Sequence, residues 1–288
     1  MFDQGKKHMH KSKYHFTATI VTYCNDMEVL KKAMDSFLIT SLNVKLYIVD
    51  NSPTDEVSTL CTDRRIEYLA NNANLGFGVA HNKILSQYEK LGDFHIILNP
   101  DIFFEKGVLE SIYDYMIAND EIGLLIPKVL YPDGRHQYLP KLFPSPIDLF
   151  IRRFPFPNSI KKRFNDAYEL RFADYSQPFD IPIVSGCFSV VKSAVIREGI
   201  KYDERFFMYF EDFDFSRRIL KKHKVICYPL AEVFHNYERG SHNNFRLLVI
   251  FLLSMIKYFN KWGWFFDQER KIINTEAIIR NKKYPSQQ

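Results

Sequence analysis

The sequence predicts an α/β protein with a mostly parallel central sheet flanked by helices. Three observations support this class: short β-branched runs alternate with helix-length segments, hydrophobic residues make up 46% of the chain against 25% charged, and strand candidates end in polar groups. Strands separated by helix-length segments form βαβ units, in which the strands run parallel. The composition is that of a globular chain with a sizeable core.

The first hundred residues alternate regularly between strand and helix patterns. Residues 16–22 (FTATIVT) form a β-branched strand, and apolar residues recur at helical spacing over 26–39. A second strand over 44–49 precedes a helical stretch from about Thr54. A short strand over 66–69, a helix over 78–90 and a buried strand over 95–98 follow. The last strand must end there, because Pro100 cannot continue a central strand.

The second half has a different texture. Five prolines among Phe and Arg over 140–157 predict an irregular loop over the site or a linker. A helix is expected to open after the aromatic run 206–210, and a strand is expected to end at His235. Residues 247–266 form either a core helix or a basic, aromatic helix at a membrane interface. The apolar run 247–256 is short against the ~20 residues that span a bilayer.

Charge and cysteine content restrict the classes of protein further. The net charge is +5, and basic residues cluster over 141–171 and after residue 240, where they could face phosphates, anionic lipid or nucleic acid. The four cysteines are scattered without a C-x-x-C pair, which argues against a zinc site or a disulfide framework and suits a reducing compartment. The polar N-terminus lacks the apolar core of a signal peptide. We expect a cytoplasmic protein that touches a membrane without crossing it.

Polar groups at three strand ends outline a candidate site. They lie at 22–25, at 50–52 and at 99–101. In parallel sheets, ligands bind beyond the carboxyl ends of the strands, so these groups are expected to converge. The loop 71–82 (NNANLGFGVAHN) contains Gly76 and Gly78, which let backbone approach a ligand at a helix N-terminus that favours phosphate. It lacks the full G-x-G-x-x-G pattern, and an ordinary turn is the simpler interpretation.

Two acidic positions and one histidine each allow two interpretations. Asp101 is a turn or helix-capping residue, or a ligand for a hard divalent cation. Glu211, Asp212 and Asp214 either stabilise a helix N-terminus or place one carboxylate in a partly desolvated pocket, where a general base is useful. His235 is structural unless it meets Asp101, because a neutral imidazole can complete a metal site.

The ordered set of motifs resembles the inverting nucleotide-sugar glycosyltransferases of family 2, which have the Rossmann-like GT-A fold. The likeness runs from about residue 16 to residue 241, and it is strongest to the bacterial rhamnosyltransferase-like branch that builds surface polysaccharides. The motifs are TATIVTYCN, VDNSP, NANLGFGVAHN, LNPDI, SGCFSVVKSAV, YDERFFMYFEDFDFSRR and the tail from His235 to Ser241. Each motif is weak alone, and the ordered set is specific to the superfamily.

The resemblance assigns roles to individual positions. It implies a metal site for Mg²⁺ or Mn²⁺ formed by Asp101, at the last acid of the DXD motif, and His235. Asn99 stands where relatives often have the first acid. It implies Asp212 as the general base with Glu211 in support. The residues implied around the nucleotide-sugar donor are Thr22, Asn25, Asp50, Asn51, Asn74, Gly76, Asn82, Asn99 and Arg239.

The implied activity is inverting transfer of a single sugar to a glycan on a polyprenyl diphosphate. The branch favours L-rhamnose from dTDP-rhamnose for an O-antigen or capsule, while UDP-galactose, UDP-N-acetylhexosamines and UDP-galactofuranose stay open. The implied organisation is a basic lead (1–14), a GT-A domain (15–240) and a C-terminal amphipathic helical segment (241–288) at the inner membrane face. Within the domain, 15–105 is the nucleotide-binding half and 106–240 the acceptor half. The Q-x-x-R-W motif of processive relatives is absent from the sequence.

Three rival classes remain to be compared. Nucleotidyl transfer would require a basic glycine-rich loop after the first strand, and residues 22–26 contain neither Gly nor Lys. A non-enzymatic nucleotide- or nucleic-acid-binding protein would explain the basic charge, but the basic residues form no recognised module and we expect no nucleic-acid partner. A catalytically inactive homologue is disfavoured because both Asp101 and Asp212 are retained.

Overall fold

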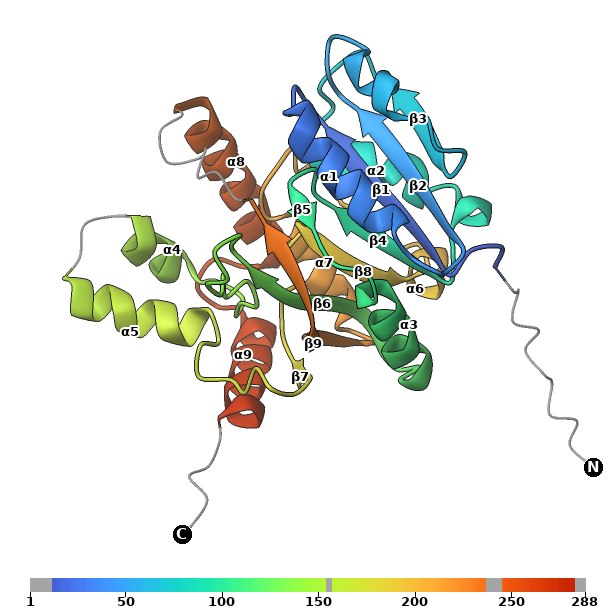
Figure 1. Ribbon diagram of the computed structural model, residues 1–288. Helices are drawn as coiled ribbons and strands as arrows, with labels where there is room; N and C mark the ends of the chain where they lie inside the picture. Colours follow the sequence, from blue (N-terminus) through green and yellow to red (C-terminus); the bar gives the residue numbers. More distant parts are fainter. Residues whose placement is uncertain (1–11, 154–156, 237–244, 283–288) are drawn as a thin grey trace, which may run out of the picture.

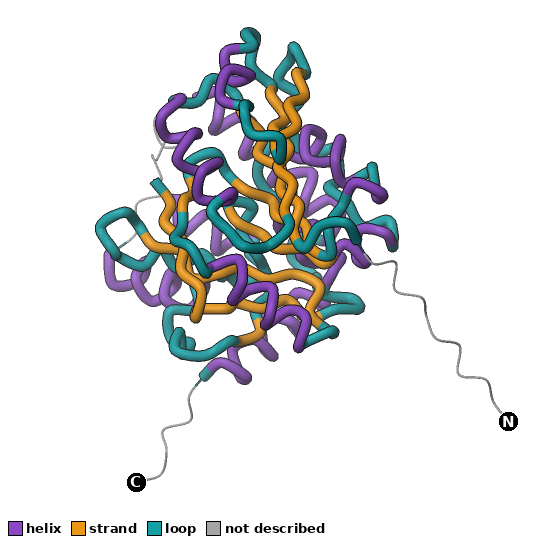
Figure 2. Tube along the Cα trace, turned by 45° about the vertical axis from the view of Figure 1, so that its right-hand side comes forward, coloured by secondary structure: helices purple, strands orange, loops and turns teal. Residues whose placement is uncertain are grey.

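A computed structural model describes residues 12–153, 157–236 and 245–282 (Figure 1). One sheet of nine strands runs through these residues in the order β3-β2-β1-β4-β8-β6-β9-β5, and β7 pairs with β9 beside this path. Helices cover both faces of the sheet, so the predicted α/β class is confirmed. Figure 2 shows that the strands of the two halves differ in direction, and the sheet curls as a result.

The N-terminal half of the sheet is entirely parallel. It contains β1 (Phe16–Thr22), β2 (Val44–Asp50), β3 (Ile66–Ala70) and β4 (Phe94–Leu98). Its helices are α1 (Met27–Leu38), capped by the Asp26 carboxylate, and α2 (Phe77–Leu85). The expected helix after Thr54 is a 3₁₀ turn (Glu56–Leu60), and the end of the expected helix over 78–90 is a second one (Tyr88–Lys90).

The second half mixes strand directions. It contains β5 (Ile102–Phe103), β6 (Ile122–Leu130), β7 (Phe179–Asp180), β8 (Phe188–Lys192) and β9 (Lys224–His235). β8 runs antiparallel to both β4 and β6, so β6 runs in the direction of β4, and β9 pairs parallel to β6. The carboxyl ends of β1, β2, β4, β6 and β9 therefore meet at one edge of the sheet, called the carboxyl edge below.

Short helices join and cover these strands. They are α3 (Val108–Ala118), which packs on β9, α6 (Ser193–Arg197), which packs on β8, and α7 (Glu211–Ile219), which packs on β6 and β9. In Figure 1, α1 and α3 lie in front of the sheet, and α2, α6 and α7 lie behind it. The buried core between them consists mainly of Ile, Leu, Val and Phe side chains from the strands and helices.

The proline-rich segment contains one helix, which corrects the expectation of an irregular loop over 140–157. Within it lies α4 (Pro146–Arg153), and α5 (Asn158–Tyr168) follows. Proline is favoured at the first position of a helix, where no N–H is needed. The Asp148 carboxylate accepts from the Ser145 N–H at 2.7 Å, and the Ser145 hydroxyl accepts from the Asp148 N–H at 3.2 Å, a reciprocal cap that starts the helix.

The C-terminal segment packs on the domain through a buried ion pair. It forms α8 (Phe245–Trp262) and α9 (Gln268–Asn281). The Arg217 guanidinium of α7 is 1% exposed, donates to both oxygens of Asp267 at 2.6 and 2.7 Å, and lies 4.3 Å from the Trp262 ring centroid. Among the described residues, none of the helices has the length and hydrophobicity that crossing a bilayer requires.

Candidate active site

The carboxyl edge brings together most of the residues singled out in the sequence. Thr22 pairs with Asp50 in the parallel register, and Asp101 follows β4 across a three-residue turn. β8 runs antiparallel to β4, so Gly186 and Cys187 lie just before it at the same edge. The backbone N–H of Gly186 then donates to the Asp212 carboxylate at 3.3 Å, which connects the start of α7 to this edge.

Asp50 is buried and held by hydroxyl groups. The Thr22 hydroxyl donates to Oδ1 of Asp50 at 2.8 Å, and the Tyr68 hydroxyl donates to Oδ2 at 2.9 Å. Burial and the bond to Asp50 raise the pKa of Tyr68 to about 12, so the phenol remains a donor at neutral pH. The carboxylate is therefore fixed in orientation at the end of β2. Tyr68 was not anticipated, because its partner becomes visible only when β2 and β3 are paired.

The loop before α2 is held by amide side chains and a left-handed glycine. Asn74 Oδ1 accepts from the Gly76 N–H at 3.0 Å, and the Asn51 amide donates to the Gly76 carbonyl at 3.4 Å. Gly76 has φ +81°, and a Cβ there would lie 2.4 Å from the Phe207 carbonyl oxygen. Only glycine fits both conditions. The Phe77 N–H donates to the same carbonyl at 2.8 Å, so this loop contacts the segment leading to α7.

Two of the amide side chains predicted at the donor site form hydrogen bonds within the protein. Asn82 is buried in the second turn of α2, where its side chain exchanges hydrogen bonds with the backbone of Tyr202 at 2.9 and 3.0 Å and also donates to Glu204. Asn25 accepts from the Tyr23 N–H and closes a turn after β1. The geometry of both amides is explained by these contacts alone. Arg239 lies outside the described residues.

Asp101 and His235 lie side by side, which is the condition set by the sequence analysis for His235 to take part in a metal site. β5 pairs antiparallel with the end of β9, which sets Ile102 opposite His235, and the Asn236 N–H donates to the Asp101 carbonyl at 3.0 Å. The Asp101 Oδ1 atom lies 3.3 Å from His235 Nε2 and accepts no hydrogen bond within the described chain. Within these residues no group of three or more His, Cys, Asp and Glu side chains forms a metal cage. A cation here would therefore need further ligands from a substrate or water, as is usual for Mg²⁺.

Glu211 and Asp212 open α7 in different environments. Burial and the neighbouring Asp212 charge raise the pKa of Glu211, whose Oε2 atom has no hydrogen-bond partner in the described residues. Burial also raises the pKa of Asp212, but the Lys141 ammonium and the N–H groups of Gly186 and Phe213 oppose that rise. Asp212 is half-buried, while Glu211 is nearly inaccessible. Asp212 is thus the more accessible carboxylate of the pair and the one beside a cation that favours its charged form, while Glu211 is buried without such a cation.

Lys141 is a nearby cation that the motifs did not single out. The segment that carries it pairs with Ile183, which lies two residues before Ser185 and three before Gly186. Burial lowers the pKa of Lys141, and Asp212 is among the anions that oppose this lowering. In sequence Lys141 is one of several basic residues in a proline-rich stretch. No pattern in the sequence separates it from the others.

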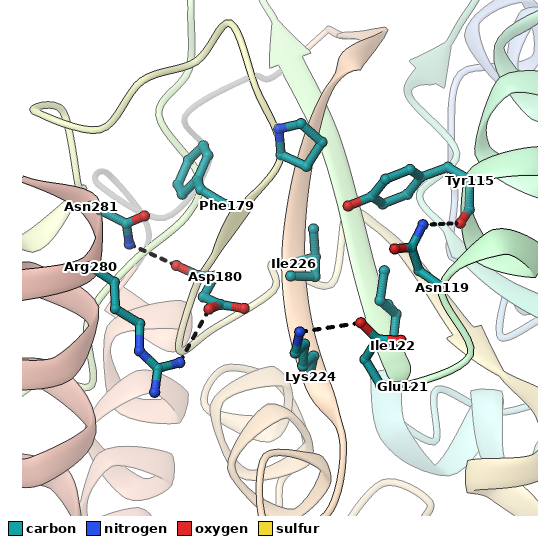
Figure 3. A pocket seen from close by; sticks show the side chains of 11 residues that line it. Tyr115, Asn119, Glu121, Ile122, Phe179, Asp180, Lys224, Ile226, Arg280 and Asn281 are labelled. Atoms are coloured by element: carbon teal, nitrogen blue, oxygen red, sulfur yellow. Dashed lines mark hydrogen bonds and ion pairs between the residues drawn. The ribbon is translucent and has the colours of Figure 1, made fainter. Parts of the chain in front are cut away.

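A separate pocket lies far from these residues. It has a volume of about 330 Å³ and is lined by the starts of β6 and β9, β7 and the end of α9 (Figure 3). Its charged side chains pair with one another, Lys224 with Glu121 and Arg280 with Asp180, both at 3.2 Å. These residues lie at the opposite ends of the strands from Leu130 and His235. The pocket is therefore distinct from the carboxyl edge.

Comparison with known proteins assigns the family. The profile of glycosyl transferase family 2 matches residues 18–199. Two similar curated proteins are N-acetylglucosaminyl-diphospho-decaprenol L-rhamnosyltransferases of Mycobacterium tuberculosis, strains CDC 1551 / Oshkosh and ATCC 25618 / H37Rv. Each is 26% identical over 230 residues, covering 75% of this chain and 74% of the relative.

A solved structure shows the same fold. The crystal structure of GalNAc-T7 with UDP, GalNAc and Mn²⁺ aligns with a TM-score of 0.65 at 16% identity, covering 89% of this chain and 49% of that one, so this chain spans about half of that protein. The chain belongs to glycosyl transferase family 2. It is a glycosyltransferase with the GT-A fold, and the family and fold expected from the sequence motifs are confirmed.

Proposed function

We propose that this enzyme transfers one L-rhamnosyl residue from dTDP-rhamnose to a lipid-linked glycan during bacterial surface polysaccharide synthesis, with inversion at the anomeric carbon. One observation carries the chemistry: a buried Asp50, an Asp101–His235 pair and a half-buried Asp212 share the carboxyl edge. The mycobacterial relatives, which are N-acetylglucosaminyl-diphospho-decaprenol L-rhamnosyltransferases, support the sugar and the diphospho-polyprenol acceptor.

The residues present fit a divalent cation. The Asp101 Oδ1 atom is buried, accepts no hydrogen bond within the described chain, and lies 3.3 Å from an imidazole nitrogen. Carboxylate and imidazole are both ligands for Mn²⁺, and Mg²⁺ commonly uses one or two carboxylates plus substrate phosphates. Asp101 and His235 would hold the ion. When bound, it acts as a Lewis acid toward the departing diphosphate.

The remaining steps fall to the side chains of the protein. Asp50, fixed by Thr22 and Tyr68, accepts hydrogen bonds from the ribose or base of the donor. The N-terminus of α2, behind Asn74 and Gly76, would favour anionic oxygen through N–H groups other than that of Phe77, which bonds to the Phe207 carbonyl. Asp212 removes the proton from the acceptor hydroxyl as that oxygen attacks the anomeric carbon. Attack opposite the departing diphosphate inverts the configuration.

A thermal-shift screen with Mn²⁺ tests the donor. The panel contains dTDP-rhamnose, UDP-galactose, UDP-N-acetylglucosamine, UDP-galactofuranose and, as a rival ligand, nucleic acid. We expect the largest rise in melting temperature with dTDP-rhamnose, because a ligand at 100 times its Kd stabilises the folded state by about 2.7 kcal/mol. Preferential stabilisation by a UDP-sugar would show that the donor is that UDP-sugar and not dTDP-rhamnose, and the proposed transfer chemistry would stay the same. If nucleic acid alone stabilised the protein, and this stabilisation weakened steeply with salt, the proposed reaction would be overturned.

We also propose that α8 rests on the inner face of the bacterial cell membrane, where a lipid-linked acceptor would be located. An exposed apolar stripe follows the helical repeat through Phe245, Val249, Leu252, Leu253 and Ile256. On its other face, Ser254 and Tyr258 are buried, and Tyr258 belongs to one buried cluster with Phe206 and Phe210. One face of α8 is thus packed against the segment that leads to Asp212, and the apolar stripe on α8 is exposed.

Vesicle co-sedimentation tests this surface. Leu252→Ser combined with Leu253→Ser should weaken binding to anionic phospholipid vesicles by about tenfold or more, since interfacial burial of two Leu side chains is worth more than 1.4 kcal/mol. Ile117→Ser on α3 removes an equally exposed apolar side chain elsewhere and serves as the matched control. Equal vesicle binding by the double variant and the control would contradict the proposed surface.

A further inference from the structure

Gln137 lies beside His235 at the carboxyl edge, at a position that no motif singled out. β6 ends at Leu130, and the turn YPDG reverses the chain with Gly134 at φ +84°. The returning segment bonds back to β6, where the Gln137 N–H donates to the Val129 carbonyl at 3.0 Å. Since β6 pairs with β9, this return places the Gln137 side chain next to the end of β9.

The orientation of the Gln137 amide is fixed by two backbone carbonyls. Its Nε2 group donates to the carbonyl of His235 at 2.9 Å and to the carbonyl of Leu130 at 3.3 Å. In the reversed orientation Oε1 would face two carbonyl oxygens, and neither of them can donate a hydrogen bond. The nitrogen must therefore face the backbone, and Oε1 must face the imidazole of His235.

This orientation determines the tautomer of His235. Gln137 Oε1 lies 3.0 Å from Nδ1 of the ring, and an amide oxygen can only accept. The hydrogen of the neutral imidazole is thus on Nδ1, and the lone pair is on Nε2. Nε2 is the nitrogen that lies 3.3 Å from Asp101 Oδ1. Two electron-pair donors then face each other across a gap that a cation can bridge.

We propose that Gln137 is a positioning residue that holds His235 in the Nδ1–H tautomer and so prepares the Asp101–His235 pair for a divalent cation. The inference rests on the metal site of the proposed function. A hydrogen-bond acceptor on the second nitrogen commonly orients metal-binding histidines, and loss of such a partner typically lowers metal affinity by about 10- to 100-fold. Here the acceptor is a neutral amide locked by backbone carbonyls of the two paired strands.

Two variants separate positioning from packing. Gln137→Met keeps the length of the side chain and removes the acceptor. Gln137→Glu keeps an acceptor for the Nδ1–H but sets a carboxylate oxygen against the two carbonyls, so it should lower stability while retaining the tautomer. The matched control is Gln87→Met, because the Gln87 amide also donates to a backbone carbonyl, that of Lys83, on α2.

The first readout is the tautomer itself, measured in the metal-free enzyme from imidazole ¹⁵N shifts near pH 8.5, where an ordinary imidazole is neutral. The signals of His235 are assigned by their loss in His235→Gln. We expect the Nδ1–H tautomer in the wild-type enzyme, in Gln87→Met and in Gln137→Glu, and a mixture in Gln137→Met. An Nε2–H or doubly protonated ring in the wild-type enzyme would overturn the inference.

The second readout is the affinity for Mn²⁺ alone, measured by the electron paramagnetic resonance signal of the free ion. We expect Gln137→Met to weaken binding by about 10- to 100-fold and Gln137→Glu to weaken it by much less. Equal weakening by both variants would reduce Gln137 to a packing role. Neither readout requires a sugar nucleotide, so a wrong donor assignment would not change these results. Absence of Mn²⁺ binding in the wild-type enzyme would instead contradict the metal site itself.

Discussion

Replacing Asp212 by Asn is expected to reduce sugar transfer by about 10²- to 10⁴-fold, the usual contribution of a positioned general base. The amide keeps the shape of the side chain but cannot take the acceptor proton. Donor binding should be nearly unchanged, because the groups proposed to bind the donor lie on the loops after β1, β2, β3 and β4 and not on α7. The measurement is turnover at saturating donor and acceptor, together with donor affinity by calorimetry.

Glu211→Gln is the matched comparison, because it makes the same change at the adjacent residue. Glu211 is buried, and burial and the Asp212 charge raise its pKa, so a neutral amide is well tolerated at this position. We expect a loss below tenfold for Glu211→Gln. Near-normal turnover in Asp212→Asn, or a larger loss in Glu211→Gln than in Asp212→Asn, would refute the assignment of Asp212 as the base.

Replacing Arg217 by Met is expected to lower the free energy of unfolding by about 3–5 kcal/mol, the range measured when one partner of a buried ion pair is removed. Asp267, whose side chain is 3% exposed, would lose two bonds of 2.6 and 2.7 Å. Its remaining partners are the Arg270 N–H at the start of α9 and, at 3.9 Å, the Arg270 guanidinium. The cost arises mainly because a buried carboxylate is left without its main counter-ion. Chemical denaturation measures it.

The same substitution at the surface provides the comparison for Arg217→Met. Arg135 pairs with Asp133 in the turn after β6, and its side chain is 77% exposed. Such pairs are screened by water, so Arg135→Met should leave the denaturation midpoint unchanged. Equal midpoints for the two variants would show that the attachment of the C-terminal helices does not depend on the buried pair.

The parallel half of the fold was readable from the sequence because its signals are local. β1, β2 and β4 are apolar runs with a punctuating residue at each end, and Asp26 caps α1 where the helix was expected. The antiparallel strands were harder to predict. β5 and β7 contain two residues each, too few for any periodicity, and they exist only because β9 offers them an edge.

Part of the site could also be predicted from the sequence, because its signals are local. Asp50, Asp101, Asp212 and His235 each follow a recognisable strand or open a helix, so position in the chain predicts position at the edge. Gln137, Lys141 and Tyr68 act through partners elsewhere in the sequence; Gln137 and His235, for example, are 98 positions apart. Only the paired strands show these contacts. Helix α4 was missed because five prolines outweighed the short cap at Ser145.

The contact between Gly76 and Phe207 limits how this enzyme can be divided or recombined. The Phe77 N–H bonds to a carbonyl 130 positions later in the chain, and β4 finds its outer neighbour in β8. Residues 15–105 alone would expose a full strand edge and a glycine loop with no surface to rest on. A chimera that exchanges residues 15–105 between homologues to change donor specificity would therefore also have to exchange residues 203–212. Residues 15–105 therefore do not form a transplantable module.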